Sequence, residues 1–182
     1  EADGLLDSTI IFWYTDHGGP LPRQKRLLYD SGIHVPLIIR FPDKLRAGEI
    51  DDQLISFVDF KSTVLSLAGM EPPPYVDGRA FLGDHVNTPN RRYIHAAADR
   101  FDSEYDMIRA VRDVRFKYLR NYKPEQPYYL PLMYREQMPI MQELLKLRDN
   151  GQLNEVQSQW FRTSEDEELS LIHISEPTRQ SP

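Results

Sequence analysis

Two short apolar runs near the start of the chain predict buried β-strands. Residues 10–14 (IIFWY) are fully apolar and β-favouring, which is typical of a central strand buried on both faces of a parallel sheet. Residues 33–40 (IHVPLIIR) predict a second strand, in which Pro36 indicates a strand end or a bulge because proline donates no ladder hydrogen bond. A central strand needs neighbours, so we expect the elements that flank residues 10–14 to be encoded upstream of this chain.

A helix is predicted over residues 59–68 (DFKSTVLSLA). Asp59 suits the N-cap position, apolar residues recur at Val64 and Leu65, and Gly69 supplies a left-handed stop. Strands followed by a helix in this order predict an α/β arrangement.

The pattern changes after the proline run at residues 72–74, which we interpret as a domain boundary. Residues 1–75 are expected to form part of the α/β core, and residues 76–168 a smaller α+β subdomain. The second part predicts strands over residues 93–97, 107–112 and 116–122, a helix from Pro139 to Gly151 with Ile140, Leu144 and Leu147 on one face, and a short helix over residues 154–160. The last two strands are separated only by a turn around Asp113, which indicates an antiparallel hairpin.

Residues 169–182 differ in character from the rest of the chain. Within them, residues 169–179 (LSLIHISEPTR) resemble the in-frame translation of a transposase adaptor used to prepare DNA libraries for sequencing. We therefore expect this tail to be non-native, and we exclude it, His173 included, from functional argument. The alternative is a short native strand of alternating Leu and Ile before a proline-ended tail.

The composition narrows the function classes. With 182 residues, 40% of them hydrophobic, the chain is long enough to bury a core. A formal net charge of -6 argues against a nucleic-acid partner, because neutralising phosphates requires a basic surface. There is no cysteine, which excludes a disulfide framework, a thiolate metal site and a cysteine nucleophile in this chain. No apolar stretch is long enough to predict a transmembrane segment.

A polar pair, Asp16 and His17, directly follows the first predicted strand. In open α/β sheets ligands bind at the carboxyl ends of strands, so both side chains lie where chemistry is usually done. An Asp oxygen with a His nitrogen suits Ca²⁺ if the other ligands are oxygens, and otherwise Zn²⁺ or Mn²⁺. Taken alone, the Asp-His-Gly tripeptide could equally be a turn.

A basic cluster follows in the same loop, with Lys25 between Arg23 and Arg26. Cations at this place suit an anionic substrate, and a Lys ammonium can approach a sulfate or phosphate oxygen as a point charge. Without further context, a solvated basic loop explains the cluster as well.

The surroundings of these residues resemble the sulfatase family. In order along the chain, the matching segments are residues 15–18 (TDHG), residues 25–36 (KRLLYDSGIHVP), which follow the pattern K-x-x-x-Y-[ED]-x-G-x-x-x-P, residues 56–69, and residues 108–119. Together they cover most of residues 9–122. Motifs in this order are far more specific than any one of them.

The resemblance implies an alkaline-phosphatase-like fold, with a mixed sheet flanked by helices and a small antiparallel subdomain that carries a C-terminal helix. It implies that Asp16 and His17 bind one Ca²⁺ together with two upstream aspartates, and that Lys25 contacts the substrate sulfate. Family members hydrolyse sulfate esters with a formylglycine made from a C/S-x-P-x-R motif. We expect no such motif in this chain, the nucleophile to lie upstream, and the chain alone to be inactive.

The resemblance also bears on substrate and compartment. The Tyr-Asp-Ser-Gly form of the loop is most similar to sulfamidase-like members, which implies a sulfated carbohydrate with an O- or N-linked sulfate. A periplasmic or secreted location is implied for the parent protein. The enzymatic alternative is a phosphoryl hydrolase or transferase of the same superfamily, with Zn²⁺ or Mn²⁺ and a Thr or Ser nucleophile. The non-enzymatic alternative is a degenerate protein that binds sulfated glycans.

Other side chains are weaker candidates for the site. His34 could point into the pocket or pack in the sheet. Asp99 and Arg100, expected in a loop, could bind a sugar hydroxyl and a second sulfate, or could form a structural ion pair. A group of tyrosines could stack on sugars or pack against the domain; its members are Tyr122, Tyr128, Tyr129 and Tyr134.

Overall fold

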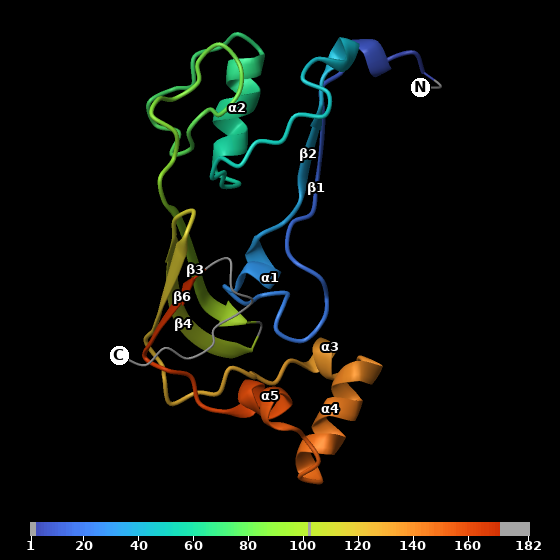
Figure 1. The fold of residues 1–182 in the computed structure, drawn as a ribbon, viewed down its shortest axis with the longest axis vertical. Coiled ribbons are helices and arrows are strands. Elements are labelled where there is room, and N and C mark those ends of the chain that lie inside the picture. The colour runs from blue at the N-terminus through green and yellow to red at the C-terminus, as the bar shows by residue number, and fades with distance from the viewer. Residues whose placement is uncertain (1–2, 102, 172–182) are drawn as a thin grey trace.

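The computed structural model describes residues 3–101 and 103–171. Within them, two antiparallel sheets are connected by short helices and loops (Figure 1). The strands are β1 (Ile11–Tyr14), β2 (Leu37–Arg40), β3 (Ile94–Phe101), β4 (Glu104–Arg112), β5 (Phe116–Asn121) and β6 (Glu167–Leu171). The helices are α1 (Asp30–Ile33), α2 (Asp59–Leu67), α3 (Met133–Glu136), α4 (Pro139–Asp149) and α5 (Glu155–Ser158), with 3-10 turns at Leu6–Ser8, Pro42–Lys44 and Gln159–Phe161.

The first sheet consists of β1 and β2, which pair antiparallel. The expectation of a parallel strand buried on both faces is wrong for this chain. Helix α2 covers one face of the pair, where Phe12 and Tyr14 pack against Phe60 with ring centroids 5.9 and 5.0 Å apart. Because side chains alternate along a strand, Trp13 and its cross-strand partner Ile38 fall on the other face, where they are 56% and 59% exposed.

The segment before β2 is not a strand, since Ile33 ends a helix and residues 34–36 are irregular. Residues 33–36 were expected in the second strand, but α1 ends at Ile33 and His34 occupies its C-cap. The backbone N–H of His34 donates to the carbonyl oxygen of Asp30 at 2.8 Å, which closes the helical turn. Strand β2 begins directly after Pro36, consistent with the prediction that this proline marks a strand end.

Helix α2 is confirmed, and it ends before Gly69, whose φ of 71° is left-handed. Asp59 does not cap it. Its buried carboxylate instead accepts the backbone N–H of Ser56 at 2.8 Å and that of Arg79 at 2.9 Å, and it pairs with the guanidinium of Arg91.

Small polar side chains on α2 hold the segment that follows the prolines. Ser62 Oγ donates to the carbonyl oxygen of Gly78 at 2.8 Å, and Ser66 Oγ accepts the N–H of His85 at 2.8 Å. A Cβ on Gly78 would lie 1.8 Å from the carbonyl oxygen of Val58. The close approach therefore requires glycine, and contacts run across the proline run into residues 78–91.

The second sheet has the order β3-β4-β5-β6 and is antiparallel throughout. The predicted hairpin is confirmed, since Asp113 Oδ1 accepts the backbone N–H groups of Arg115 and Phe116 at 2.7 and 2.6 Å. Strand β6 continues to Leu171, past the start of the predicted non-native tail at Leu169. Residues 172–182, with His173, lie outside the described part of the chain.

Two clusters of buried apolar residues form the core, and the larger one lies on the four-stranded sheet. The larger brings Leu27, Leu28 and Tyr29 from the loop after β1 onto the sheet; its other buried members are Ala110, Leu119, Leu130 and Leu132. The smaller contains Tyr129, Met141 and Trp160.

The face that α4 buries differs in part from the predicted apolar face. Leu144 packs against the smaller cluster as expected, but Ile140 is exposed and its neighbour Met141 is fully buried. The docking partners Tyr129 and Trp160 select this face, and both come from segments outside α4.

Candidate functional site

Two motif glycines bring the candidate site together. The backbone N–H of Gly18 donates to the carbonyl oxygen of Gly32 at 2.9 Å. A Cβ on Gly18 would lie 1.8 Å from the carbonyl oxygen of Ser31, and one on Gly32 would lie 2.2 Å from that of Leu27. The Asp-His-Gly and Tyr-Asp-Ser-Gly segments therefore pack backbone to backbone, which no side chain would allow.

The loop between these glycines fixes the backbone of Lys25. Its N–H donates to the carbonyl oxygen of Gly19 at 3.1 Å, and Ser31 Oγ donates to that of Arg23 at 2.8 Å. Arg23 and Arg26 have φ values of 63° and 72°, in the left-handed region that non-glycine residues rarely adopt. Such backbone persists only when its surroundings determine it. The backbone of Lys25 therefore has a defined conformation in the loop that follows Asp16 and His17.

Asp16 and His17 present two ligand atoms in one place. His17 Nδ1 lies 2.6 Å from the carbonyl oxygen of Gly18, which can only accept, so Nδ1 is the donor and Nε2 is the ring nitrogen left to bind a cation. That Nε2 lies 3.5 Å from Asp16 Oδ1. A histidine that donates its other ring N–H to a backbone carbonyl is the usual arrangement of a metal ligand. The pair fits a divalent cation, although no cluster of three or more ligating side chains occurs among the described residues.

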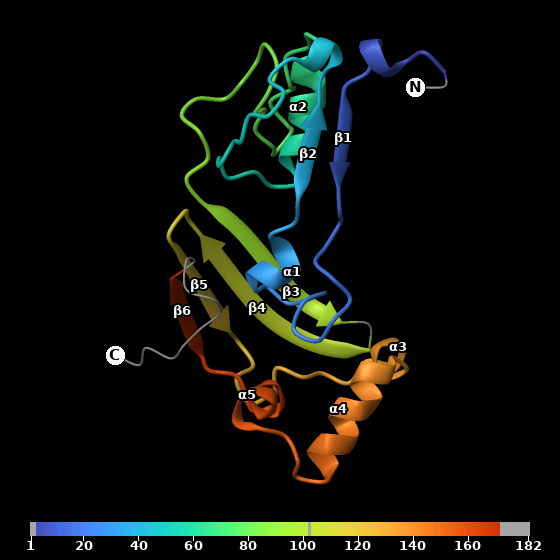
Figure 2. The same cartoon turned by 45° about the vertical axis from the view of Figure 1, so that its right-hand side comes forward.

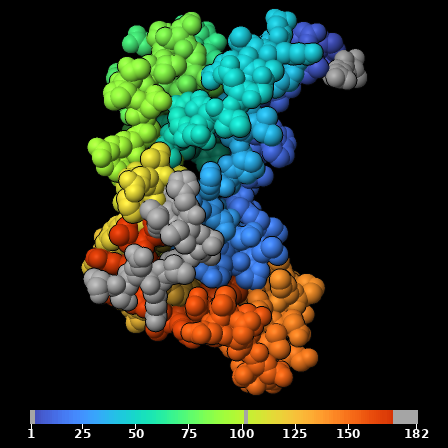
Figure 3. All heavy atoms as spheres, in the orientation of Figure 1, coloured from blue at the N-terminus to red at the C-terminus, as the bar shows by residue number. Residues whose placement is uncertain are grey.

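The cations of the loop lie over aromatic rings, one of them from a distant helix. Lys25 Nζ and Arg26 Cζ lie 5.4 and 5.2 Å from the ring centroid of Tyr134 on α3, and Arg23 Cζ lies 5.6 Å from that of Tyr29. In Figure 3 the blue surface of the loop after β1 meets the orange surface of α3 and α4. Helix α3 thus contributes a side chain to the surroundings of Lys25.

Tyr29 ties the loop to a buried carboxylate on β6. Its hydroxyl donates to Glu168 Oε2 at 3.2 Å, and that of Tyr128 donates to Glu168 Oε1 at 3.0 Å. Burial raises the pKa of Glu168 above its usual value, an effect that hydrogen bonds from Tyr128, Tyr29 and Asn121 only partly oppose. Burial likewise raises the pKa of Tyr29, and that of Tyr128 to about 12, so both phenols stay protonated as donors.

Asp30 ties the same loop to β4 and β5. Its Oδ1 lies 2.9 Å from Lys117 Nζ and its Oδ2 lies 3.4 Å from Arg112 Nη2. Burial acts to raise the pKa of Asp30, but the hydrogen bond from Lys117 and the charges of Lys117 and Arg112 outweigh it and hold the pKa below its usual value. Figure 2 shows α1 lying against the four-stranded sheet at this place. His34 is exposed and occupies the C-cap of α1, so it does not pack in a strand.

Asp99 and Arg100 lie in β3 rather than in a loop, and the register of β3 against β4 shifts between Ala98 and Arg100. Asp99 Oδ1 forms an ion pair with Arg109 Nη1 at 2.7 Å, so its partner comes from the neighbouring strand. The end of β3 lies beside the loop between β1 and α1 in both ribbon views (Figures 1 and 2).

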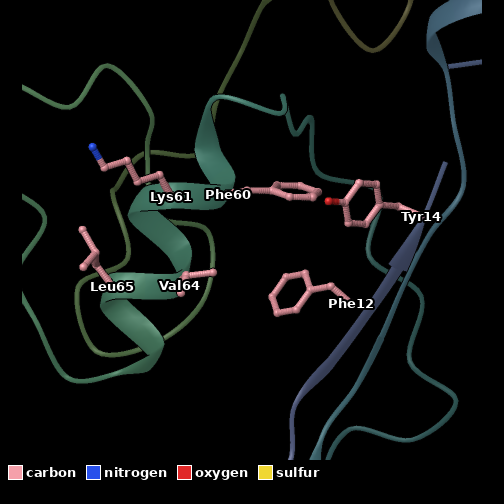
Figure 4. A pocket seen from close by; sticks show the side chains of 6 residues that line it. All are labelled: Phe12, Tyr14, Phe60, Lys61, Val64 and Leu65. Atoms are coloured by element: carbon pink, nitrogen blue, oxygen red, sulfur yellow. The ribbon is translucent and has the colours of Figure 1, made fainter. Parts of the chain in front are cut away.

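A pocket of about 450 Å³ opens elsewhere, between β1 and α2. Phe12, Tyr14, Phe60 and Val64 line it, and the amine of Lys61 points away from the two β1 rings (Figure 4). Its lining is mainly apolar, with Lys61 as the one charged side chain, and it does not include the loop that holds Lys25.

Sequence reasoning missed the role of Glu168, Lys117 and Tyr134. All three reach the loop from more than eighty residues away, and nothing in their local pattern indicates a partner. Tyr134 was noted only as one of several tyrosines, of which Tyr129 and Tyr128 pack in or against the core.

The expected absence of a C/S-x-P-x-R motif needs one correction. Ser175-Glu176-Pro177-Thr178-Arg179 matches that pattern in the printed sequence. It lies within the tail that resembles an adaptor, outside the described residues, and it follows Asp16 and His17, whereas the resemblance places the nucleophile before them.

Comparison with known proteins decides the family. The family model of the C-terminal region of N-sulphoglucosamine sulphohydrolase matches residues 23–167. The chain belongs to the sulfatase family. It matches the C-terminal part of such enzymes, and the matched range includes Lys25 and the Tyr-Asp-Ser-Gly segment.

Individual sulfatases show how much of the enzyme this chain represents. An ulvan-active sulfatase of Formosa agariphila is 65% identical over 97% of the chain, which spans 30% of that relative. An N-acetylglucosamine-6-O-sulfatase of Bacteroides thetaiotaomicron is 38% identical over 43% of the chain and 15% of its own length. The chain thus spans less than a third of the curated sulfatases it matches.

Solved structures confirm the α/β class and the alkaline-phosphatase-like fold. A protein solved in complex with its substrate D-glucosamine-2-N,6-O-disulfate is 25% identical, with a TM-score of 0.58 over 87% of this chain and 36% of that one. A second structure, from Bacteroides thetaiotaomicron, is 19% identical with a TM-score of 0.56 over 79% of this chain and 35% of that one, and shows the fold alone. Of the helices described here, none has the length and apolar character needed to cross a membrane.

Proposed function

We propose that this chain is the C-terminal part of a sulfatase that hydrolyses sulfate from a carbohydrate, with Lys25 as a sulfate-binding residue. The observation that supports the proposal is the loop in which Gly18 packs on Gly32, because Asp16, His17 and Lys25 all belong to that loop. The names of related proteins, which include ulvan-active and N-acetylglucosamine-6-O-sulfatases, support a sulfated sugar.

Asp16 and His17 would supply two ligands to a Ca²⁺ ion, with further oxygen ligands from the part of the enzyme that precedes this chain. Ca²⁺ accepts six to eight ligands, mostly oxygens, so two from this loop leave room for others and for a sulfate oxygen. A bound Ca²⁺ would draw electron density from the sulfate oxygens and favour attack at sulfur. The nucleophile, a formylglycine in this family, would also come from the preceding part.

Lys25 would offset the negative charge of the sulfate group and of the oxygen that leaves. Its ammonium is a compact charge, and Arg26 lies beside it over the same ring. Arg23 belongs to the same basic loop and lies over Tyr29. Asp99 and Arg100, at the end of β3, are candidates for contacts to the sugar.

The test uses the full-length protein that contains this chain. Sulfate release is measured from ulvan and from N-acetylglucosamine 6-sulfate, before and after Ca²⁺ is removed with a chelator. Lys25→Ala is expected to lower kcat/KM by about 10²-fold or more, the size typical of removing one charge-stabilising donor. Asp16→Asn is expected to raise the Ca²⁺ concentration needed for half-maximal activity.

Lys61→Ala is the matched control, because Lys61 lies on α2 at the apolar pocket. Its activity is expected to equal that of the wild type. Faster release of phosphate from a phosphate ester than of sulfate from its sulfate analogue would contradict the proposal and favour the phosphoryl-transfer alternative. Binding of sulfated sugar without turnover would favour the degenerate glycan-binding alternative.

A further inference from the structure

Tyr134 lies against the cationic side chains of the candidate site. Lys25 Nζ is 5.4 Å and Arg26 Cζ 5.2 Å from its ring centroid. Cations within about 6 Å of a ring centroid are attracted to the negative face of the ring. One ring thus keeps two like charges close together, and their combined field attracts an anion.

The ring itself is held in place by its buried neighbours. Leu132 precedes the single turn of α3 and is almost completely buried. Arg135, the next residue after Tyr134, is also buried, with its guanidinium carbon 5.3 Å from the ring centroid of Tyr129 and 4.9 Å from that of Trp160. Leu132, two residues before Tyr134, and Arg135, directly after it, anchor α3 in the core, so the partly exposed Tyr134 is presented to the loop.

The side chain of Lys25 needs such a contact. Its backbone is fixed by the hydrogen bond to Gly19, but a lysine ammonium stands on a flexible four-carbon stem. A ring at 5.4 Å favours the rotamers that bring the ammonium to the face of Tyr134 over those that direct it into solvent.

We propose that Tyr134 is a positioning residue for sulfate recognition, whose ring holds the ammonium of Lys25 where it meets the sulfate group of the substrate. This inference rests on the proposed function, because it assigns Lys25 to sulfate. It adds a residue of α3 to the proposed sulfate-binding residues, which lie in the loop between β1 and β2.

The experiment measures binding of inorganic sulfate, the fragment common to every sulfate ester, to the full-length protein by isothermal titration calorimetry. Tyr134→Leu removes the ring and is expected to weaken sulfate binding about two- to fivefold, the size of a solvent-accessible cation–π contact. Tyr134→Phe keeps the ring and is expected to bind like the wild type. If Tyr134→Leu unfolds, which its thermal midpoint reveals, Tyr134→Met takes its place.

Tyr105→Leu is the matched control. Tyr105 is an exposed tyrosine on β4 with a lysine, Lys123, 4.4 Å from its ring centroid. Its removal is expected to leave sulfate binding unchanged, because the cation on that ring, Lys123, is not a candidate site residue.

The outcomes separate the two proposals. Weaker binding by Lys25→Ala together with unchanged binding by Tyr134→Leu overturns the role of Tyr134 and leaves the proposed function standing. Loss in Tyr134→Phe equal to that in Tyr134→Leu shows that the hydroxyl acts instead of the ring, and overturns the inference too. Failure of the wild type to bind sulfate overturns both proposals.

Discussion

At the scale of single residues, Gly18 is the position where the fold most clearly requires a glycine. Gly18→Ala would place a Cβ 1.8 Å from the carbonyl oxygen of Ser31 and 2.9 Å from Gly32 Cα, both of them backbone atoms. The two loop segments would have to separate, so we expect a loss of about 1–3 kcal/mol in the free energy of unfolding, measured by urea denaturation.

The neighbouring glycine provides the control for this change. A Cβ on Gly19 would meet only the end of the Gln24 side chain, which is flexible and can turn aside. Gly19→Ala is therefore expected to cost much less than Gly18→Ala. Equal losses for the two variants would show that backbone contact does not distinguish them.

Glu168 predicts how stability depends on pH. Because burial raises its pKa in the folded chain, the folded state binds a proton more readily than the unfolded state does. This carboxyl group therefore stabilises the folded state relatively more at low pH, and its contribution falls as pH rises above the ordinary value of 4.5. Glu168→Gln removes the titration but keeps an oxygen that can accept from Tyr128.

The measurement compares urea denaturation of the wild type and Glu168→Gln between pH 4.5 and 7.5. The difference in unfolding free energy is expected to move in favour of Glu168→Gln as pH rises. A difference that stays constant, or moves in favour of the wild type, would show that the folded-state pKa of Glu168 is not raised.

The site residues divide by how far away their partners lie in sequence. Asp16, His17 and Lys25 stay predictions, but the contact between Gly18 and Gly32 that holds their loop joins two motifs that lie close together in the sequence. The ring next to Lys25 belongs to Tyr134 on α3, and the sequence pattern of that helix does not indicate the contact. Such contacts depend on how segments far apart in the chain pack together. That packing cannot be read from a single sequence.

At the scale of elements, the ion pair between α1 and β5 anchors the site loop to the sheet. Lys117 Nζ lies 2.9 Å from Asp30 Oδ1, and the Lys117 side chain is only 4% exposed. Lys117→Met is expected to lower the unfolding free energy by about 2–3 kcal/mol, less than the roughly 3–5 kcal/mol of a fully buried pair because Asp30 is half-buried. Chemical denaturation followed by circular dichroism measures the loss.

Arg120→Met on the same strand is the control. Arg120 pairs with Glu167 at the surface, where both side chains are exposed, and such pairs contribute little to stability. The loss in Lys117→Met is expected to be clearly larger. A similar loss in both variants would mean that the Asp30 contact does not anchor α1.

Elements were predictable where local signals agree with tertiary contacts. The helix ending before Gly69, the hairpin at Asp113 and the helix starting at Pro139 all carry their own start or stop residues. The pattern erred over residues 33–36, where a β-favouring composition lies at the end of α1. There, the approach of Gly18 to Gly32 requires a tight helical turn that residue preference does not reveal.

At the scale of the whole molecule, the two sheets differ in how many neighbouring strands and core residues stabilise them. Strands β4 and β5 each have a partner on both sides and lie over the larger cluster. Strands β1 and β2 form a two-stranded pair with α2 on one face, and Trp13 and Ile38 are exposed on the other. A pair of strands with one covered face is only marginally stable, whereas a larger sheet over a core is not.

Hydrogen exchange of this chain is therefore expected to resolve the two sheets. The amides of β1 and β2 should exchange by local opening, at a lower free energy than those of β4 and β5, which should approach the free energy of global unfolding. Mass spectrometry of peptides covering β1 and β5 in one sample makes the comparison internal. Equal protection of both would mean that the contacts of Phe12 and Tyr14 with Phe60 couple the small sheet to the rest of the chain.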